Sequence, residues 1–469
     1  DTIIGLPANI FYGTGIPTII IILKQKRTNT DILFVDASKG FVKEGKNNKL
    51  RASDIKRIVD VVTRREDIDK FSRVVSRDEI RSNEYNLNIP RYVDSSEAAE
   101  SWDIFSSMFG GIPNSEVELL NDYWKAFPTL KSSLLEATSS AYCRVTRDDV
   151  KKAIKEHDDI KGFENKFKDA FDGLDDYLHD ALIVQMDNIN ISKKEEALAE
   201  SIFSRLAGIP LVDKYEAYQL LDDDWANIAI DLEIIQTEGF NATRVVDPNM
   251  VIKKKDNKEQ EVQEGWKGRI IPFELVQNCL LSDETKSIED KENRLAEIIS
   301  EYEEAFDNLS EEEKELECVN EDSFVFSEVK KALKNDSVDS ETKEKLKSVM
   351  ALNTEEKGIK SEIKKEKALL EERTKEIIEN LSDEQIVLLL REKWINPLIS
   401  NLMQLPERIV SDLVSKVEAL SKKYDSTLAE LENEIESTER ELSKMIDELE
   451  GNEFDMLGLA EFKKLLGGE

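Results

Sequence analysis

Short apolar runs at the beginning of the chain predict β-strands. Residues 2–6, 16–23 and 31–36 are rich in isoleucine, leucine and valine, and each run is too short for a buried helix. Because the apolar residues follow one another without alternating, we expect both faces of these strands to be buried, as in the middle of an α/β sheet. The first two strands enclose a loop, residues 6–18, that contains two glycines and an aromatic pair.

Apolar residues three or four positions apart predict helices over most of the remaining chain. Residues 53–65 are the first of these helices, with Ser53 as the expected N-cap. The preceding segment, residues 39–49, is rich in Lys, Gly and Asn and predicts an exposed loop. Helical spacing dominates from about residue 95, although residues 240–275 are mixed and include a polar, solvated tongue at 253–264.

The apolar positions from residue 408 onward follow one another in steps of three and four, which is the spacing of a coiled coil. One extra step of four near Leu428 predicts a stutter. Two arrangements fit this pattern: an antiparallel hairpin of residues 355–381 against 408–450, or docking onto helices of a partner. The apolar tail after Asn452 would be exposed unless something covers it. The residues expected to make a subunit contact are Leu431, Ile435, Leu442, Leu449, Phe454, Leu457 and Phe462.

These changes of pattern divide the 469 residues into four parts. We expect an α/β segment at 1–95, a helical domain at 96–239, and a mixed acidic region at 240–350. Long helices with a coiled coil and an apolar tail follow at 351–469. A chain of this length can bury a substantial core.

The charge and the cysteine content restrict the partners and the compartment. A net charge of −34 excludes a protein that binds DNA through a basic surface over its whole length, so any DNA contact is local or made by a partner. Cys143, Cys279 and Cys318 form no Cys-x-x-Cys pair, which favours a reducing cytosol over a disulfide framework or a zinc site. No apolar run approaches the roughly 18 residues of a membrane span. We therefore expect a cytoplasmic protein without a membrane partner.

Few other side chains suggest a catalytic, metal-binding or DNA-binding role. His157 and His179 lie in charged helical sequence and are interpreted as helix-surface residues. Three consecutive aspartates at 222–224 would point in different directions on a helix, so a solvated face is favoured over a metal site. The basic run at 39–51 has two interpretations, a solvated loop or a contact with DNA phosphate. The residues that would make the phosphate contact are Lys43, Lys46, Lys49 and Arg51.

Four blocks of sequence, in this order, resemble the modification (methyltransferase) subunit of type I restriction-modification systems. They are the loop at 6–18, the run at 31–38, Ser-Arg-Val-Val at 72–75, and Tyr-Asn-Leu-Asn-Ile-Pro-Arg-Tyr at 85–92. In that family, such blocks close the adenine-N6 methyltransferase domain. The resemblance implies that residues 1–95 are an α/β remnant, the last strands of a Rossmann-like methyltransferase sheet. A weaker likeness extends to about residue 280.

The resemblance also implies what this chain lacks. The family's catalytic Asn-Pro-Pro-aromatic motif is absent, and so is the first strand of the domain with its loop for S-adenosylmethionine. We therefore expect a C-terminal portion that is inactive alone and contains no catalytic, cofactor-binding or metal-binding residue.

The whole protein implied by the resemblance is an adenine-specific DNA methyltransferase that uses S-adenosylmethionine. Its expected partners are the DNA-specificity subunit, the restriction subunit, and double-stranded DNA bound mainly through the specificity subunit. The alternative is a non-enzymatic interaction module with a coiled coil.

The glycine loop fits this family as a pocket rim. Phe11-x-Gly13-x-Gly15 superficially matches a loop that cradles S-adenosylmethionine, but a loop of that type opens a helix. Here the glycines lead into a second strand, which favours a rim between strands. An adenine methylase flips its base out of the duplex and holds it by stacking. The rim residues expected to line the target-base pocket are Asn9, Phe11, Tyr12, Gly13, Gly15 and Pro17.

Overall fold

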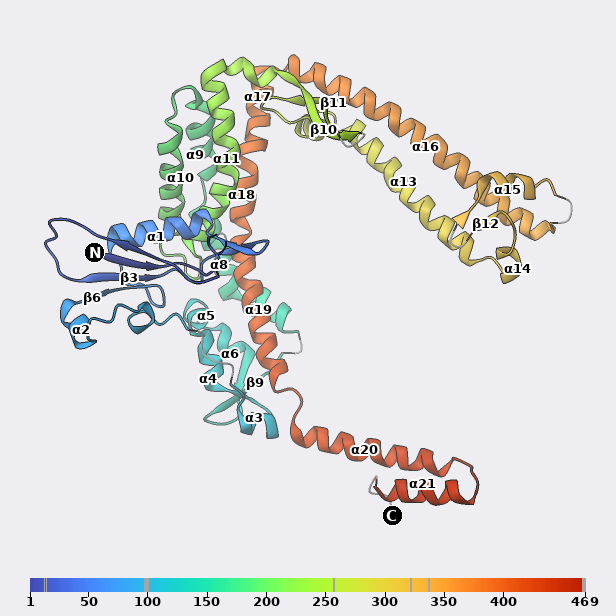
Figure 1. Cartoon of the computed structure of the whole chain (residues 1–469), viewed down its shortest axis with the longest axis horizontal. Helices are drawn as coiled ribbons and strands as arrows, with labels where there is room; N and C mark the ends of the chain where they lie inside the picture. Colours follow the sequence, from blue (N-terminus) through green and yellow to red (C-terminus); the bar gives the residue numbers. More distant parts are fainter. Residues whose placement is uncertain are drawn as a thin grey trace. The chain divides into compact units, whose positions relative to one another are not determined.

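The computed structural model describes residues 1–11, 13, 15–96, 101–147, 149–255, 258–320, 323–335 and 338–465 (Figure 1). They form two compact units. The first contains Asp1–Leu174, Ser192–Trp225 and Leu398–Glu469, and the second contains Asp175–Ile191 and Ala226–Pro397. The boundaries expected at residues 95, 239 and 350 stay predictions.

The first unit begins with a four-stranded sheet in the order β2-β1-β3-β6. Its strands are β1 (Thr2–Gly5), β2 (Ile19–Ile22), β3 (Ile32–Asp36) and β6 (Ser72–Val75). β1 and β3 run parallel, whereas β2 and β6 run antiparallel to their neighbours. The three apolar runs predicted to be strands are therefore confirmed as β1, β2 and β3.

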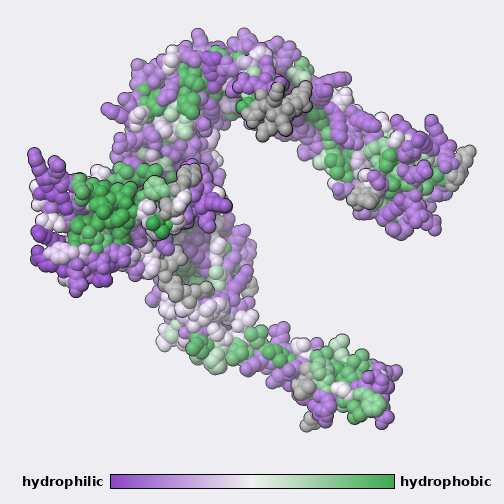
Figure 2. All heavy atoms as spheres, in the orientation of Figure 1, coloured by the Kyte–Doolittle hydropathy of each residue, from purple (hydrophilic) through white to green (hydrophobic). Residues whose placement is uncertain are grey.

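The burial predicted for these runs is correct for β1 and β3 but wrong for β2. β2 lies at the edge of the sheet, and Ile19, Ile20 and Ile21 are 58%, 46% and 55% exposed. Figure 2 shows the apolar patch over these N-terminal strands. A continuous apolar run indicates that a strand tolerates burial on both faces, but it does not specify which neighbours cover that strand.

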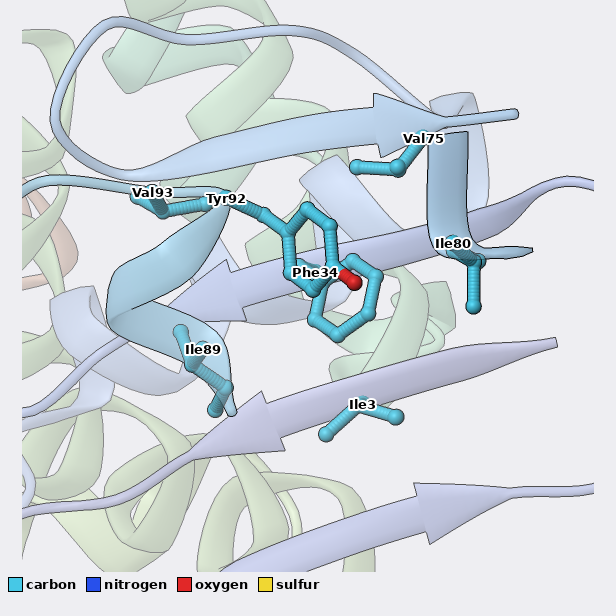
Figure 3. Close-up of a cluster of buried hydrophobic side chains, with 7 residues drawn as sticks. All are labelled: Ile3, Phe34, Val75, Ile80, Ile89, Tyr92 and Val93. Carbon is cyan, nitrogen blue, oxygen red and sulfur yellow. The ribbon is translucent and has the colours of Figure 1, made fainter. Parts of the chain in front are cut away.

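One face of the sheet is covered by the segment that follows β6. This segment contains α2 (Arg77–Ser82) and a 3-10 turn at Ile89–Arg91. The Phe34 ring stacks on the Tyr92 ring with centroids 4.4 Å apart, and the Tyr92 hydroxyl donates a 2.6 Å hydrogen bond to the Asn86 carbonyl. The buried cluster in Figure 3 consists of Ile3, Phe34, Val75, Ile80, Ile89, Tyr92 and Val93.

The other face packs against α1 (Ala52–Arg64), whose Val61 joins a buried cluster with residues of β1 and β3. The predicted N-cap, Ser53, is wrong. Arg51 occupies the cap, and its N–H donates to the Asp54 carboxylate at 2.9 Å. Ser53 is buried in the helix, and its N–H donates to the Gln219 side chain. The acidic residue three positions after the cap therefore determines where α1 begins.

The loop predicted at 39–49 is wrong, because it contains a hairpin of β4 (Val42–Glu44) and β5 (Asn47–Lys49). Gly45 has a φ of +63° at the first of the two turn positions. A two-residue hairpin turn favours glycine where φ is positive. The glycine that suggested an exposed loop therefore belongs to a tight turn.

Short helices and a small sheet, β7-β9-β8, follow in the first unit. The strands are β7 (Ile112–Pro113), β8 (Leu135–Ala137) and β9 (Tyr142–Val145). The helices are α3 (Ile104–Phe109), α4 (Asn114–Val117), α5 (Asn121–Ala126), α6 (Leu130–Leu134), α7 (Val150–Lys155), α8 (Asp158–Ala170), α10 (Ile191–Leu206) and α11 (Lys214–Glu238). A short 3-10 turn lies at Glu118–Leu120. α11 continues past Trp225 into the second unit, which also contains the 3-10 turn at Met186–Asn188.

The C-terminal residues form separate helices instead of the continuous coiled coil predicted from residue 408. The helices are α18 (Asn396–Met403), α19 (Leu405–Lys423), α20 (Leu428–Asp447) and α21 (Glu453–Leu465). α19 ends at Lys423 with Tyr424 as its C-cap, and Thr427 caps α20 through a capping box with Glu430. The irregular spacing near Leu428, which predicted a stutter, therefore marks a break between two helices.

The second unit is mostly helical. It contains α9 (Leu174–Leu178), a π-helical turn at His179–Val184, a 3-10 turn at Phe240–Arg244, α12 (Phe273–Leu280), α13 (Ser282–Asp307), α14 (Glu311–Lys314), α15 (Phe326–Ala332), α16 (Ser340–Glu379), α17 (Asp383–Leu390) and a second π-helical turn at Arg391–Ile395. The strands are β10 (Val246–Lys255), β11 (Lys258–Gly268), β12 (Val319–Asn320) and β13 (Ser323–Phe324). The polar tongue predicted at 253–264 belongs to the β10–β11 hairpin.

The partner of the long helix α16 is α13, and the two lie side by side in Figure 1. Ion pairs join Arg373 to Glu284 and Arg294 to Glu355, so the numbering falls along one helix as it rises along the other. The antiparallel hairpin is therefore 282–307 against 340–379. The predicted pairing of residues 355–381 with 408–450 is wrong, because spacing alone does not specify which helix is the partner.

Candidate functional site

The candidate site lies where the parallel strands β1 and β3 end. In open α/β sheets, ligands bind outside the carboxyl ends of the strands. Gly5 pairs with Asp36 at this edge, so the loop after β1 and the segment after β3 leave the sheet side by side. The topology therefore brings residues 6–18 and the β4–β5 hairpin to one edge.

The loop at 6–18 has a defined backbone at its base. The Leu6 N–H donates a 2.8 Å hydrogen bond to the Thr18 carbonyl, which extends the β1–β2 pairing by one step. Asn9 and Gly13 have φ values of +56° and +80°. Asparagine and glycine adopt this left-handed conformation more readily than other residues. The sequence of the loop therefore suits a backbone that turns twice between the strands.

The β4–β5 hairpin supports this loop through Asn48. The Asn48 N–H donates to the Asn9 carbonyl at 2.9 Å, and its side-chain amide donates to the Ala8 carbonyl at 2.7 Å. Sequence reasoning missed Asn48, since an asparagine near glycine and lysine is typical of any exposed loop. The two bonds bring the predicted rim and the predicted basic run together at one site.

The described rim residues are accessible. Phe11 is 54% exposed, Gly13, Gly15 and Pro17 are exposed, and Asn9 is partly buried. A β-carbon at Gly15 would lie 3.3 Å from the Asn9 side-chain oxygen, so glycine permits the close approach of these two segments. Tyr12 lies outside the described residues. The Phe11 ring offers a flat apolar face beside polar backbone, an arrangement that can stack on an aromatic ligand.

The four basic residues of the site differ in their partners. Lys43 and Lys46 are exposed on the hairpin. Lys49 forms an ion pair with Glu44 at 3.1 Å. Arg51 donates two side-chain hydrogen bonds to Asp54, at 3.1 and 3.2 Å. These hydrogen bonds raise the pKa of Arg51 above its usual range. Lys43 and Lys46 are therefore the cations best placed to meet an external anion.

Asp36 is a buried carboxylate that sequence reasoning did not select. It ends β3, where it accepts hydrogen bonds from the Ser38 N–H at 3.0 Å and the Ser95 hydroxyl at 2.5 Å. Its signal in the sequence is an acidic residue directly after a buried apolar run. Because Ser95 reaches back from the end of the 85–92 block, Asp36 ties that block to the candidate edge.

The other candidate residues belong to elements outside the N-terminal sheet. His157 caps α8, and its side chain accepts a hydrogen bond from the Asp159 N–H. On α11, burial raises the pKa of Asp222 and of Asp224. Cys143 and Cys318 are buried and Cys279 is exposed. The described part of the chain contains no group of three His, Cys, Asp or Glu residues placed to hold a metal ion. None of its helices is long and apolar enough to cross a membrane.

The predicted subunit-contact residues lie on the last two helices, α20 and α21, which are side by side in Figure 1. All seven side chains are exposed. Leu431, Ile435 and Leu442 lie on α20, and Leu449 follows its end. Phe454, Leu457 and Phe462 lie on α21.

Comparison with known proteins concerns the N-terminal part of the chain. Residues 1–101 match the family model for N-6 DNA methylases. The methylase subunit of the type I restriction enzyme MpnII from Mycoplasma pneumoniae is 41% identical over 105 residues, which are 22% of this chain and 19% of that protein. Two methylase subunits from Methanocaldococcus jannaschii, MjaVII and MjaVIII, are 39% and 33% identical over 130 and 142 residues. These matches cover 26% and 29% of this chain, and 22% and 24% of the two relatives.

A crystal structure of the methyltransferase subunit of a type I restriction-modification system from Streptococcus thermophilus is 55% identical. The match covers 20% of this chain and 20% of that chain, with a TM-score of 0.20. The chain spans about a fifth to a quarter of the length of the curated relatives that it matches.

Proposed function

We propose, from the match of residues 1–101 to the N-6 DNA methylase family model, that the whole protein is the methylase subunit of a type I restriction-modification complex. The resemblance to type I methylase subunits seen in the sequence is confirmed by the relatives. The proposed reaction is transfer of a methyl group from S-adenosylmethionine to the N6 amine of adenine in DNA. The observation that carries the proposal is the docking of the β4–β5 hairpin on the loop at 6–18, within the family segment.

The proposed role of the loop is to hold the flipped adenine. A base taken out of the duplex is held by stacking and by hydrogen bonds to its edge. Phe11 offers an exposed ring, and the carbonyl of Asn9 is already occupied by the Asn48 N–H. The stacking face therefore comes from Phe11 or from Tyr12, and Asn48 keeps the loop in position.

The proposed role of the hairpin is a contact with DNA phosphate next to the flipped base. Lys43 and Lys46 carry exposed ammonium groups on the element that supports the rim. With a net charge of −34, the chain as a whole repels DNA, so such a contact has to be local. Recognition of the DNA sequence is assigned to the specificity subunit.

The described residues do not fit S-adenosylmethionine. The glycine loop runs from β1 to β2 and opens no helix, whereas a cofactor loop of the Gly-rich kind opens a helix. We therefore assign no step to the cofactor within this chain and expect it to be bound by other residues of the whole protein. A chain tested alone should not bind labelled S-adenosylmethionine.

The exposed isoleucines of β2 fit the same proposal. An edge strand with apolar residues on both faces is a site for further strand pairing and for covering elements. We assign this surface to contacts with the remaining strands of a complete methylase sheet. The proposed partners of the whole protein are the specificity subunit, which also contacts α20 and α21, and the restriction subunit.

The test replaces the two aromatic residues in the full-length subunit within its complex. Loss of a base-stacking ring costs about 1–3 kcal/mol, so Phe11→Ala or Tyr12→Ala should lower kcat/KM for adenine methylation by about fivefold to 150-fold. Phe11→Trp, which keeps a flat ring, should retain most of the activity. Unchanged methylation by both alanine variants would refute the assignment.

A further inference from the structure

A pocket of about 550 Å³ lies between α1 and the end of α10, within the first unit. The loop that joins α10 to α11 forms another part of its wall. Arg64 of α1 lines the pocket, and the next residue, Arg65, donates a 2.6 Å hydrogen bond to Asp31, which directly precedes β3. The candidate site lies at the other end of β3. The pocket is therefore separate from the loop at 6–18.

Three cationic side chains line the pocket, and none of them has a close partner. Arg57 and Arg64 come from α1, and Lys214 is the first residue of α11. The ion pairs of the two arginines are loose, with N–O distances of 3.6 Å to Asp213 and 3.8 Å to Glu66. Hydrogen-bonded pairs are closer, at about 2.7–3.2 Å. Lys214 forms no ion pair with another described residue, and its contacts are with aromatic rings.

Other cations of α1 are held much more closely. Lys56 donates a 2.8 Å hydrogen bond to Asp60, and Arg65 donates one of 2.6 Å to Asp31. Arg57 follows Lys56 directly, yet its Nε is buried without a hydrogen-bond acceptor among the described residues. Buried donors are normally paired. The loosely paired cations of α1 are therefore the ones that line the pocket.

Aromatic rings fix the positions of two of these cations. The Arg57 guanidinium lies over the Phe71 ring, 4.3 Å from its centre. The Lys214 ammonium lies 5.2 Å from the centre of the Phe203 ring and 5.0 Å from that of the Tyr215 ring. A cation–π contact holds the charge over the ring without supplying a lone-pair acceptor for each N–H group. Both cations are therefore held in place with N–H donors left for a ligand.

The loop between α10 and α11 has an unusual backbone where it lines the pocket. Leu211 has a φ of +68°, and the next residue, Val212, is part of the pocket wall. A positive φ is uncommon for residues other than glycine, and such residues cluster at ligand sites. The backbone thus points to the same place as the loosely paired cations.

We propose that this pocket binds a small phosphate ester. The phosphate oxygens accept hydrogen bonds from Arg57, Arg64 and Lys214, and the organic part lies against the apolar side chains of Phe203 and Val212. Guanidinium groups match the geometry of phosphate oxygens, and an ammonium adds a compact positive charge. The volume lies within the range of about 300–1,000 Å³ that is usual for small-molecule sites.

The phosphate backbone of DNA is a poor ligand for this pocket. Glu66, Glu200 and Asp213 also line it, so they balance the charge of the three cations. Binding to a duplex through its phosphates depends on an excess of positive charge on the protein surface. A small anion needs only to replace the loose contacts of Asp213 and Glu66 with shorter hydrogen bonds to the two arginines.

The experiment measures binding of three probes to the full chain by isothermal titration calorimetry in 50 mM salt. The probes are uridine monophosphate, uridine and inorganic phosphate. Uridine monophosphate should bind, inorganic phosphate should bind at least tenfold more weakly, and uridine should show no binding. A uracil nucleotide is chosen because an adenine nucleotide would also be a ligand for the proposed target-base rim. Phe11→Ala should leave the affinity for uridine monophosphate unchanged, so the two proposals fail separately.

Two pairs of variants test the pocket. Arg64→Gln with Lys214→Gln should weaken binding of uridine monophosphate at least tenfold. Lys151→Gln with Lys161→Gln makes the same change in net charge at exposed positions on α7 and α8 and should change the affinity less than twofold.

The second pair keeps the net charge constant. Ser204 lines the pocket, and its hydroxyl donates to the Glu200 carbonyl at 2.8 Å within α10. Ser204→Trp fills the pocket and should abolish binding, whereas Ser204→Ala, which loses the same hydrogen bond, should retain it. Thermal unfolding of each variant shows that the chain is folded.

Four results would overturn the proposal. They are no binding of uridine monophosphate or of phosphate, equal binding of uridine and its monophosphate, unchanged binding by the Arg64/Lys214 and Ser204→Trp variants, and an equal loss in the Lys151/Lys161 control. The last result would assign binding to net charge rather than to this pocket.

Discussion

Replacing Lys43 and Lys46 with glutamine in the full-length subunit tests the phosphate contact most directly. Both ammonium groups are exposed on the hairpin that Asn48 fastens to the rim. Lys49 already has Glu44 as its partner, and Arg51 is held by Asp54. The double variant therefore removes the two exposed cations of the hairpin that have no ion-pair partner among the described residues, and it leaves Gly45 and Asn48 unchanged.

The magnitude follows from counterion release. Each phosphate contact contributes about 0.9 to the slope of log affinity against log salt on duplex DNA. Two lost contacts should therefore reduce the slope by about 1.8. Over a fourfold rise in salt, from about 50 to about 200 mM, the wild-type complex should lose about twelvefold more affinity than the variant complex.

The assay is a salt titration of DNA binding by the assembled complex, read by fluorescence anisotropy. Lys330→Gln with Lys334→Gln is the matched control, because it changes the net charge equally on exposed residues near α15 in the second unit. This control should leave the slope unchanged. An equal slope for the Lys43/Lys46 variant and the wild type would refute the phosphate contact. An equal reduction of the slope in this variant and in the Lys330/Lys334 control would show that the effect comes from net charge alone.

Two further predictions concern stability. Phe34 is fully buried and stacks on Tyr92, so Phe34→Ala should lower the free energy of unfolding by about 3–5 kcal/mol. Tyr92→Phe should lower it by only about 1 kcal/mol, through its lost hydrogen bond. Thermal unfolding of the chain measures both losses, and equal losses would contradict the packing argument. Hydrogen bonds from Lys345, and then from the Ser310 N–H, lower the pKa of Glu313 from 4.5 to about 2. Since a carboxylate with a lowered pKa stabilises the fold above its unfolded pKa, this contribution should be complete above about pH 4.5 and disappear as the pH falls through about 2. Denaturant unfolding of wild type and Glu313→Gln should therefore differ at pH 6 and converge near pH 2, and a constant difference would count against this pair.

The strands of the N-terminal sheet were predictable because their signal is local. Apolar runs bounded by turn residues define β1 and β3, and both are buried as expected. The exposure of β2 was not predictable, because burial depends on which strand lies beside it, and a sequence pattern carries no such information. The order β2-β1-β3-β6 places β2 at the edge, and its isoleucines are exposed there.

The candidate site was predictable in its parts and not in its assembly. Phe11 and the lysines of the hairpin were selected from residue type and local pattern. Their contact depends on Asn48, which lies 40 residues from Ala8 in the chain. A hydrogen bond between an amide and a backbone carbonyl leaves no pattern in one sequence, so the supporting residue of the site was missed.

In the C-terminal helices, the apolar spacing and the capping box predict different structures. The apolar spacing across residues 413–435 is nearly regular, which favours one long helix. The same sequence holds Thr427 and Glu430 at the spacing of a capping box, which begins a new helix. The structure follows the capping signal, because Thr427 and Glu430 satisfy backbone N–H groups that a continuous helix would bond elsewhere. Once the chain turns there, α20 no longer continues the packing of α19 on α7 and α8. The apolar side chains of Leu428, Leu431 and Ile435 are therefore left exposed, although their spacing is that of packed helices.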